Sequence, residues 1–166
     1  MKVAAMIRRQ WLGLLAIFGL GSRAARAQTA ASSSAPASPL ALDESQWKQK
    51  LSPAQFDVLR REGTERPYSS ALNAEKRPGR YECAGCGAPL FGAEMKFDSG
   101  TGWPSFHSAL PGALQTRTDF KLLFPRTEYH CTHCGGHHGH VFNDGPAPTG
   151  KRYCNNGVAL RFVARA

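Results

Sequence analysis

The sequence lacks an apolar run long enough to span a bilayer and has few acidic residues. The apolar stretch Trp11–Leu20 has ten residues, against the roughly 20 that a membrane-spanning helix needs. The chain holds 21 Lys and Arg against 12 Asp and Glu, but five of the basic residues and none of the acidic ones lie in residues 1–27. The remainder carries 16 basic against 12 acidic residues, a net charge of +4, without a cluster of basic and aromatic residues. We therefore expect no nucleic-acid partner.

Residues 1–27 have the pattern of an export signal. Lys2, Arg8 and Arg9 precede the apolar stretch, and Ala25-Arg26-Ala27 fits a small-x-small cleavage site. The arginine pair fits the twin-arginine export pattern, and an ordinary secretory signal with two arginines fits equally well. We expect an exported, periplasmic protein cleaved near Ala27, with an uncleaved signal that anchors the protein to the membrane as the alternative.

The rest of the chain divides into a linker and one domain. Residues 28–42 are rich in Ala, Ser and Pro and carry no charge, which predicts a disordered linker. Residues 43–166, about 124 residues, suffice for a single domain with one core. A helix is predicted to start at Pro53, because Ser52 is a capping residue with Gln55 three positions later, and to stop at Gly63.

After Pro67 the chain has many glycines and prolines between short apolar runs, which is typical of short strands. The fold class predicted is mainly β, with short antiparallel sheets, a small helical N-terminal cap and a structural zinc site of four cysteines. The predicted strands cover residues 89–91, 95–97, 120–124, 141–142 and 158–163.

The cysteines number only five, of which four form two CxxC pairs, Cys83/Cys86 and Cys131/Cys134, each followed by glycine. Two such pairs offer four thiolates, the set that tetrahedral Zn²⁺ prefers, and the glycines allow tight turns whose N–H groups reach the sulfurs. We expect one structural zinc ion that joins two hairpins distant in sequence, with His133 beside the ligands rather than among them.

Other uses of the CxxC pairs fit the sequence less well. Two disulfides are an alternative, because the periplasm is oxidising. Covalent haem attachment is excluded, because glycine and not histidine follows each pair. A thioredoxin-like redox pair would need a βαβ setting, which the pattern of short strands does not provide.

The fifth cysteine, Cys154, lies between Arg152 and Asn156 and is a candidate nucleophile. A nearby guanidinium lowers a thiol's pKa, and residues two apart share one face of a strand. The alternative is a structural thiol before an Asn-Gly hairpin turn. The three histidines His137, His138 and His140 favour the reactive role, because an imidazole can stabilise a thiolate and give a proton to a developing oxygen. Trp103 in its Gly-Trp-Pro loop is a candidate binding wall, or a packing residue.

Four segments resemble the methionine-R-sulfoxide reductases, the MsrB family, and together they cover nearly all of residues 43–166. They read SPAQFDVLRREGTERPYSS, SGTGWPSFHSAL, CTHCGGHHGHVFNDGPAPTGKRYC and NNGVALRF. The resemblance implies an oxidoreductase that repairs proteins under oxidative stress by reducing methionine-R-sulfoxide, through a sulfenic acid on its cysteine. It also implies a monomer that acts on oxidised proteins and is recycled by a thioredoxin-like protein or a small thiol.

The resemblance assigns roles to individual residues. The catalytic group would be Cys154 as nucleophile, His140 as proton donor and His137 beside it; Trp103 and Asn156 would bind substrate. Arg152 and Asp144 would form the supporting shell, and Cys83, Cys86, Cys131 and Cys134 would hold Zn²⁺ without taking part in the chemistry.

The chain departs from the family's pattern at two positions. Many members carry a second, resolving cysteine, in some at the place of Thr101, so an external thiol is expected to complete each cycle here. Family members often have an apolar residue where this chain has His138. Two other classes share the residue types: a zinc-knuckle binding module, and a hydrolase using Cys154, His140 and Asn156.

Overall fold

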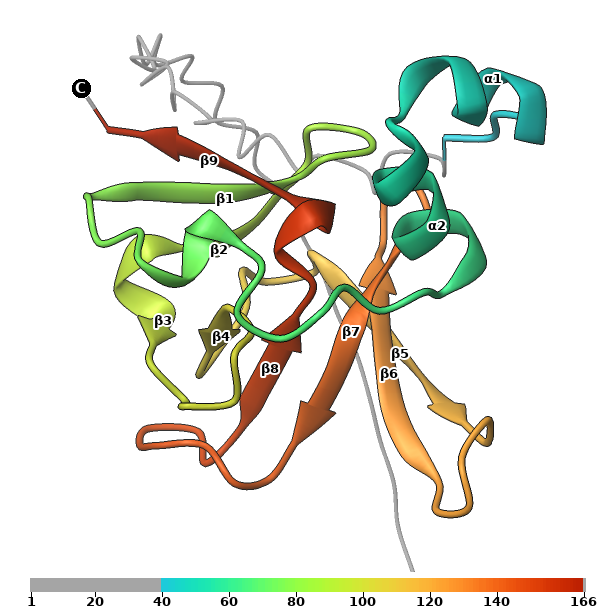
Figure 1. Ribbon diagram of the computed structural model, residues 1–166. Helices are drawn as coiled ribbons and strands as arrows, with labels where there is room; N and C mark the ends of the chain where they lie inside the picture. Colours follow the sequence, from blue (N-terminus) through green and yellow to red (C-terminus); the bar gives the residue numbers. More distant parts are fainter. Residues whose placement is uncertain (1–39, 166) are drawn as a thin grey trace, which may run out of the picture. The chain divides into compact units, whose positions relative to one another are not determined.

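The computed structural model describes residues 40–165 and confirms the predicted class, mainly antiparallel β with two short helices (Figure 1). The predicted export signal and residues 28–39 of the predicted linker lie outside the described residues. The helices are α1 (Glu44–Lys50) and α2 (Pro53–Arg61). The strands are β1 (Gly79–Cys83), β2 (Pro89–Gly92), β3 (Lys96–Phe97), β4 (Ser105–Phe106), β5 (Leu114–Asp119), β6 (Arg126–Cys131), β7 (His137–Phe142), β8 (Arg152–Asn155) and β9 (Leu160–Ala164). Neither α1 nor α2 is long and apolar enough to cross a membrane.

Reciprocal capping starts both helices. In α2 the Ser52 hydroxyl accepts a hydrogen bond from the Gln55 N–H, and the Gln55 side chain accepts one from the Ser52 N–H, as predicted. The last helical residue is Arg61, and the cap that follows, Glu62, adopts the left-handed conformation with φ of 58°, one residue before the predicted stop at Gly63. Helix α1 was not predicted, although Asp43 and Gln46 cap it by the same pattern.

The strands form two sheets, one with the order β2-β1-β9 and the other with the order β3-β4-β8-β7-β6-β5. All pairs are antiparallel. In the larger sheet β8 is central, with β4 on one side and β7 on the other. Cys154 in β8 therefore faces residues from two neighbouring strands, Ser105 and His140.

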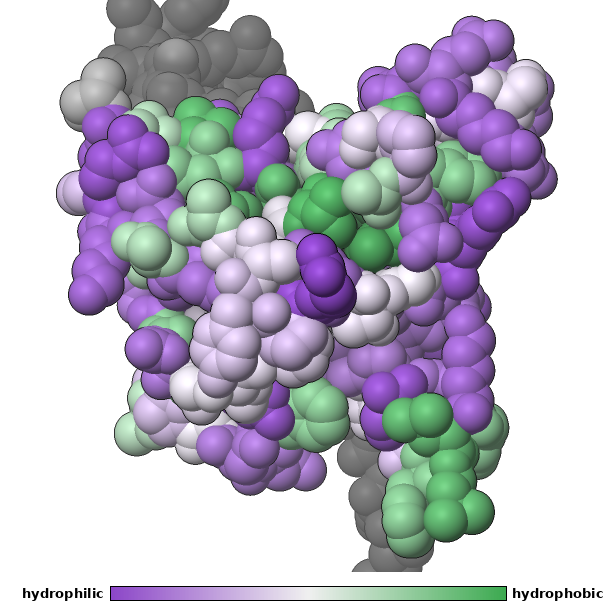
Figure 2. All heavy atoms as spheres, in the orientation of Figure 1, coloured by the Kyte–Doolittle hydropathy of each residue, from purple (hydrophilic) through white to green (hydrophobic). Residues whose placement is uncertain are grey.

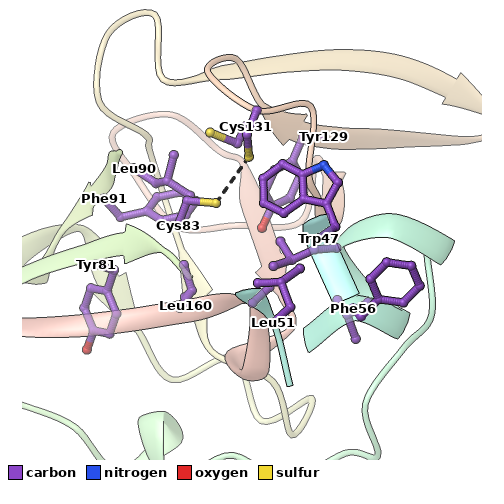
Figure 3. Close-up of a cluster of buried hydrophobic side chains, with 14 of the residues drawn as sticks. Trp47, Leu51, Phe56, Tyr81, Cys83, Leu90, Phe91, Tyr129, Cys131 and Leu160 are labelled. Carbon is purple, nitrogen blue, oxygen red and sulfur yellow. Dashed lines mark hydrogen bonds between the residues drawn. The ribbon is translucent and has the colours of Figure 1, made fainter. Parts of the chain in front are cut away.

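The core is rich in aromatic side chains (Figure 3). Phe91 and Phe106 stack with ring centroids 4.1 Å apart, and Tyr81 meets Phe106 edge to face at 4.9 Å. Trp47 of α1 is 2% exposed and packs into this cluster. The chain joins the core before Asp43, since Leu40 and Leu42 pack against it and the Leu40 N–H donates to the His133 carbonyl at 2.7 Å.

The strand predicted over residues 120–124 is wrong, because this segment is the turn of the β5–β6 hairpin. The Asp119 carboxylate accepts a hydrogen bond from the Lys121 N–H, and Pro125 has no N–H to continue a ladder. Four apolar side chains at the turn are exposed, and they form the green area at the lower right of Figure 2. They are Phe120, Leu122, Leu123 and Phe124.

The last predicted strand is only partly right. A 3₁₀ turn, Gly157–Ala159, precedes β9, so Asn156-Gly157 leads into that turn rather than into a hairpin. The segment 95–97 is likewise split between a 3₁₀ turn and the two residues of β3.

Candidate active site and metal centre

A pocket opens over β7 and β8 at the thiol of Cys154. Its lining residues are Thr64, Trp103, Arg126, Gly139, His140, Phe142, Cys154, Asn155 and Asn156. Its volume of about 140 Å³ is below the roughly 300–1,000 Å³ of pockets that enclose small-molecule ligands. The space therefore suits one side chain better than a cofactor.

Cys154 is half-buried, and its pKa is decided by opposing effects. Burial raises the pKa of the thiol, while the Arg152 guanidinium and the Thr101 hydroxyl lower it by smaller amounts. The effect of Arg152 has the expected sign, but burial outweighs it. Arg152 also donates two hydrogen bonds, of 2.9 and 2.8 Å, to the Asp144 carboxylate, which partly balances its positive charge. The resting form of Cys154 near neutral pH is therefore the thiol, and its proton needs an acceptor.

His140 lies opposite Cys154 in the β7–β8 register, so both side chains are on one face of the sheet. Its Nε2 is 2.8 Å from the Asp119 carboxylate, which also accepts a hydrogen bond from Arg126 at 2.7 Å. Burial lowers the pKa of His140, and the hydrogen bond to Asp119 raises it by less. The neutral ring donates Nε2–H to Asp119, which leaves Nδ1 as the basic nitrogen. Neither Asp119 nor Arg126 was predicted as a site residue.

A β-bulge directs the side chains of His137 and His138 away from the Cys154 pocket. The β6–β7 register shifts between Tyr129 and His130, so that His137 and His140, three residues apart, share one face of β7. His137 is 3% exposed, holds Glu128 at 2.6 Å and lies beside the His140 ring, with centroids 5.6 Å apart. It is not among the residues that line the Cys154 pocket. His138 points to the metal centre instead, with Nε2 3.4 Å from the Cys83 sulfur.

Glu65, which was not predicted as a site residue, connects two residues that line the pocket, Trp103 and Asn156. Its carbonyl accepts a hydrogen bond from the Trp103 indole at 3.1 Å, and its N–H donates to the Asn156 side chain at 3.0 Å. Its carboxylate accepts from the N–H groups of Gly157 and Val158. The Asn156 amide also donates to the His138 carbonyl at 3.0 Å. Asn156 therefore holds the backbone together around the pocket that it lines.

The four cysteines of the CxxC pairs meet in one cluster. All their sulfurs lie within 4.8 Å of one another, with Cys83–Cys134 and Cys86–Cys131 each at 3.6 Å. A tetrahedron of thiolates with metal–sulfur bonds of about 2.3 Å has edges of about 3.8 Å. The residues therefore fit a single tetrahedral ion, held by the β1–β2 and β6–β7 turns. Figure 3 shows Cys83 and Cys131 among the buried side chains of the core.

The closeness of the four sulfurs disfavours four negative charges in the absence of a metal. Hydrogen bonding with Cys131 raises the pKa of Cys83 and of Cys134 well above the ordinary thiol value. Four thiolates at this spacing thus require a divalent ion to balance them. Gly87 and Gly135 have φ of 78° and 67°, as the turns need. The N–H groups of these two glycines donate to the carbonyls of Cys83 and Cys131. The turn N–H groups that reach sulfurs, as predicted, are those of Ala88 at Cys86 and of Cys134 at Cys131.

Fold and site together define a small β domain with a thiol pocket and, apart from it, a four-cysteine metal centre. The family model described as the SelR domain matches residues 51–164. The chain is 51% identical over 120 residues to a peptide methionine sulfoxide reductase MsrB of Methanosarcina barkeri, covering 72% of this chain and 84% of the relative. It is 51% identical to the protein of the same name from Thiobacillus denitrificans over 120 residues, 72% of this chain and 91% of the relative.

A third relative of that name, from Pseudomonas savastanoi pv. phaseolicola, is 50% identical over 121 residues, 72% of this chain and 92% of the relative. The chain belongs to the SelR-domain family, the peptide methionine sulfoxide reductases of the MsrB type, and it is an oxidoreductase. The predicted family is thereby confirmed.

Proposed function

We propose that the protein reduces the R epimer of methionine sulfoxide in oxidised proteins, with Cys154 as the nucleophile. One observation carries the proposal: Cys154 and His140 face each other in the pocket, with Asp119 bonded to the far side of the imidazole. Trp103 stands at the same pocket and gives the substrate's methyl group an apolar surface. The family's activity on methionine sulfoxide supplies the reaction.

The first step we propose is a proton transfer from the Cys154 thiol to His140. Because burial keeps Cys154 protonated and His140 neutral, the thiol gives its proton to Nδ1 of His140. Asp119 stabilises the imidazolium that results, since its carboxylate accepts the Nε2–H. His140 thus acts first as base and then as acid.

The thiolate then attacks the sulfoxide sulfur, and the imidazolium protonates the sulfoxide oxygen. The attack forms an S–S bond, and the hydroxyl then shifts from the substrate sulfur to the Cys154 sulfur as the S–S and S–O bonds to the substrate sulfur break. Cys154 is left as a sulfenic acid, and methionine leaves with two more electrons than the sulfoxide had. The atoms balance, because sulfoxide and thiol become thioether and sulfenic acid. Arg126, which lines the pocket, adds a positive charge near the developing oxygen.

The thiol is restored by an external reductant. The other four cysteines are in the metal cluster, so no described cysteine can resolve Cys154. One reductant thiol forms a mixed disulfide and releases water; a second frees Cys154 and leaves as a disulfide. A small thiol or a thioredoxin-like protein can supply both.

Zn²⁺ is the ion we propose for the metal centre, because four thiolates in a tetrahedron are its preferred structural site. Such a closed site fixes the two turns and takes no part in the reaction. Export to the periplasm, where the substrates would be oxidised envelope proteins, follows from the pattern of residues 1–27.

The hydrolase alternative is weaker on one observation. The Asn156 amide is engaged with Glu65 and His138, so it does not orient His140; Asp119 does. The binding-module alternative leaves the Cys154 pocket without a role.

The test uses the purified protein with each epimer of N-acetyl-methionine sulfoxide and dithiothreitol. We expect methionine from the R epimer only, and none from C154S. A dimedone adduct on Cys154 after one turnover without reductant would report the sulfenic acid. C154S should keep the metal and the fold of the parent, which metal content and circular dichroism check. Equal reduction of both epimers, or activity in C154S, would exclude the proposal.

A further inference from the structure

His138 is a buried imidazole that the proposed reaction does not use. Its side chain is fully buried in β7, and its Nε2 lies 3.4 Å from the sulfur of Cys83. It is outside the four-cysteine group and outside the lining of the Cys154 pocket. Its other nitrogen, Nδ1, has no hydrogen-bond partner among the described residues. The contact with Cys83 is therefore the one side-chain hydrogen bond of the ring with good geometry, and the Asn155 side chain lies close enough to the imidazole to oppose the effect of burial on its pKa.

The hydrogen in this contact has only one source when a metal is bound. A metal-bound Cys83 is a thiolate and has no S–H to donate. The imidazole must then carry its hydrogen on Nε2, because a lone pair there would face the negative sulfur. An N···S separation of 3.4 Å fits an N–H···S hydrogen bond, which is longer than one to oxygen because sulfur is larger.

Two of the other three sulfurs, those of Cys86 and Cys131, accept hydrogen bonds from backbone N–H groups. The Ala88 N–H acts on Cys86, and the Cys134 N–H acts on Cys131, each lowering the thiol's pKa. Cys83 is 0% exposed, so water does not replace such a donor. For this sulfur, the donor recorded in the structure is the imidazole of His138.

We propose that His138 is a positioning residue of the metal centre: it donates Nε2–H to the Cys83 thiolate, fixes that ligand and strengthens metal retention. The bond withdraws charge from a buried thiolate and restricts its side chain. The inference rests on the metal centre of the proposed function and on no part of the redox chemistry.

The test compares H138M and H138Q. Methionine has a similar length but no N–H, whereas the amide nitrogen of glutamine can take the place of Nε2. Outer-shell donors change metal affinity by about 10–100-fold. We expect H138M to bind Zn²⁺ more weakly within that range in competition with a chromophoric chelator, and H138Q to stay within about threefold of the parent. H133M is the matched control, because His133 lies between the ligands with no recorded side-chain hydrogen bond.

Substitution with Co²⁺ gives a second readout that is independent of activity. Loss of the N–H makes the Cys83 thiolate a stronger donor, so the thiolate-to-cobalt charge-transfer band should move to longer wavelength in H138M and not in H138Q. Parent-like affinity and an unchanged band in H138M would overturn the proposal.

A folding defect in H138M is addressed by comparing H138N with H138Q. Both place an amide in the same cavity, but only glutamine reaches the sulfur, so asparagine should lose metal and glutamine keep it. Equal affinities in these two variants would also overturn the proposal. Reduction of methionine sulfoxide is not a readout here, so failure of the proposed reaction would remain distinguishable.

Discussion

Replacing Asp119 by asparagine tests the acid–base part of the proposed mechanism most directly. The Asp119 carboxylate accepts hydrogen bonds from His140 at 2.8 Å, from Arg126 at 2.7 Å and from the Lys121 N–H at 2.8 Å. Asparagine has nearly the same shape but replaces one acceptor oxygen by an N–H₂ group. If its oxygen keeps the bond to Lys121, its amide hydrogens face the N–H groups of His140 and Arg126.

The size of the effect follows from the interaction that is lost. A hydrogen bond to a charged group contributes about 1.5–3 kcal/mol, and each 1.36 kcal/mol changes a rate about tenfold. We expect D119N to lower kcat for the R epimer by about 10- to 150-fold, because the imidazolium formed during the reaction loses its carboxylate. The neutral ring would also place its hydrogen on Nδ1 and lose the base that faces the pocket.

The pH dependence has a definite sign. Burial lowers the pKa of His140, and Asp119 opposes that shift, so removing the carboxylate lowers the pKa of His140 further. The acidic limb of the kcat/KM profile assigned to this histidine should therefore move to lower pH in D119N. A steady-state assay from pH 5 to 9 measures both the rate and the limb.

The matched control is D98N. Asp98 also accepts a backbone hydrogen bond two residues on, from the Gly100 N–H at 2.9 Å, but it is exposed and its recorded bond is to the backbone alone. It should retain kcat within about twofold, and thermal unfolding of both variants shows whether the turns are intact. D119N with parent-like kcat and an unchanged acidic limb would refute the role given to the Asp119–His140 pair.

Three further outcomes are expected. Because burial raises the pKa of Cys154, its alkylation by iodoacetamide should be slow at pH 7 and rise through a midpoint above the ordinary thiol value; a midpoint below that value would contradict the burial argument. T101C should form a disulfide between its new thiol and Cys154 after one turnover, because the Thr101 hydroxyl is close enough to the Cys154 thiol to lower its pKa through a hydrogen bond. If mass spectrometry finds both of these thiols still reduced, the two side chains are too far apart to react. C131S should lose the metal and melt at least about 10 °C lower, since a structural ion contributes several kcal/mol; an unchanged melting curve in C131S would remove the metal's structural role.

Features that depend on short spacing along the chain could be predicted from the amino-acid sequence. The CxxC-Gly pairs predicted a four-cysteine cluster, and the structure brings all four sulfurs within 4.8 Å. The Ser52–Gln55 capping pair predicted the start of α2, because such a cap involves residues three apart. The strand predicted over residues 120–124 was wrong, because apolar composition alone does not distinguish a buried strand from an exposed hairpin turn.

The contacts of each histidine depend on tertiary packing and could not be predicted from the sequence. His137, His138 and His140 are close neighbours in sequence, yet they reach Glu128, Cys83 and Asp119 respectively. The bulge opposite His130 changes the faces of β7, and the partners come from β6, β1 and β5, so no local pattern contains the answer. The pKa of Cys154 is likewise set mainly by burial, which depends on tertiary packing. The opposing effect of Arg152, its neighbour in the sequence, is smaller.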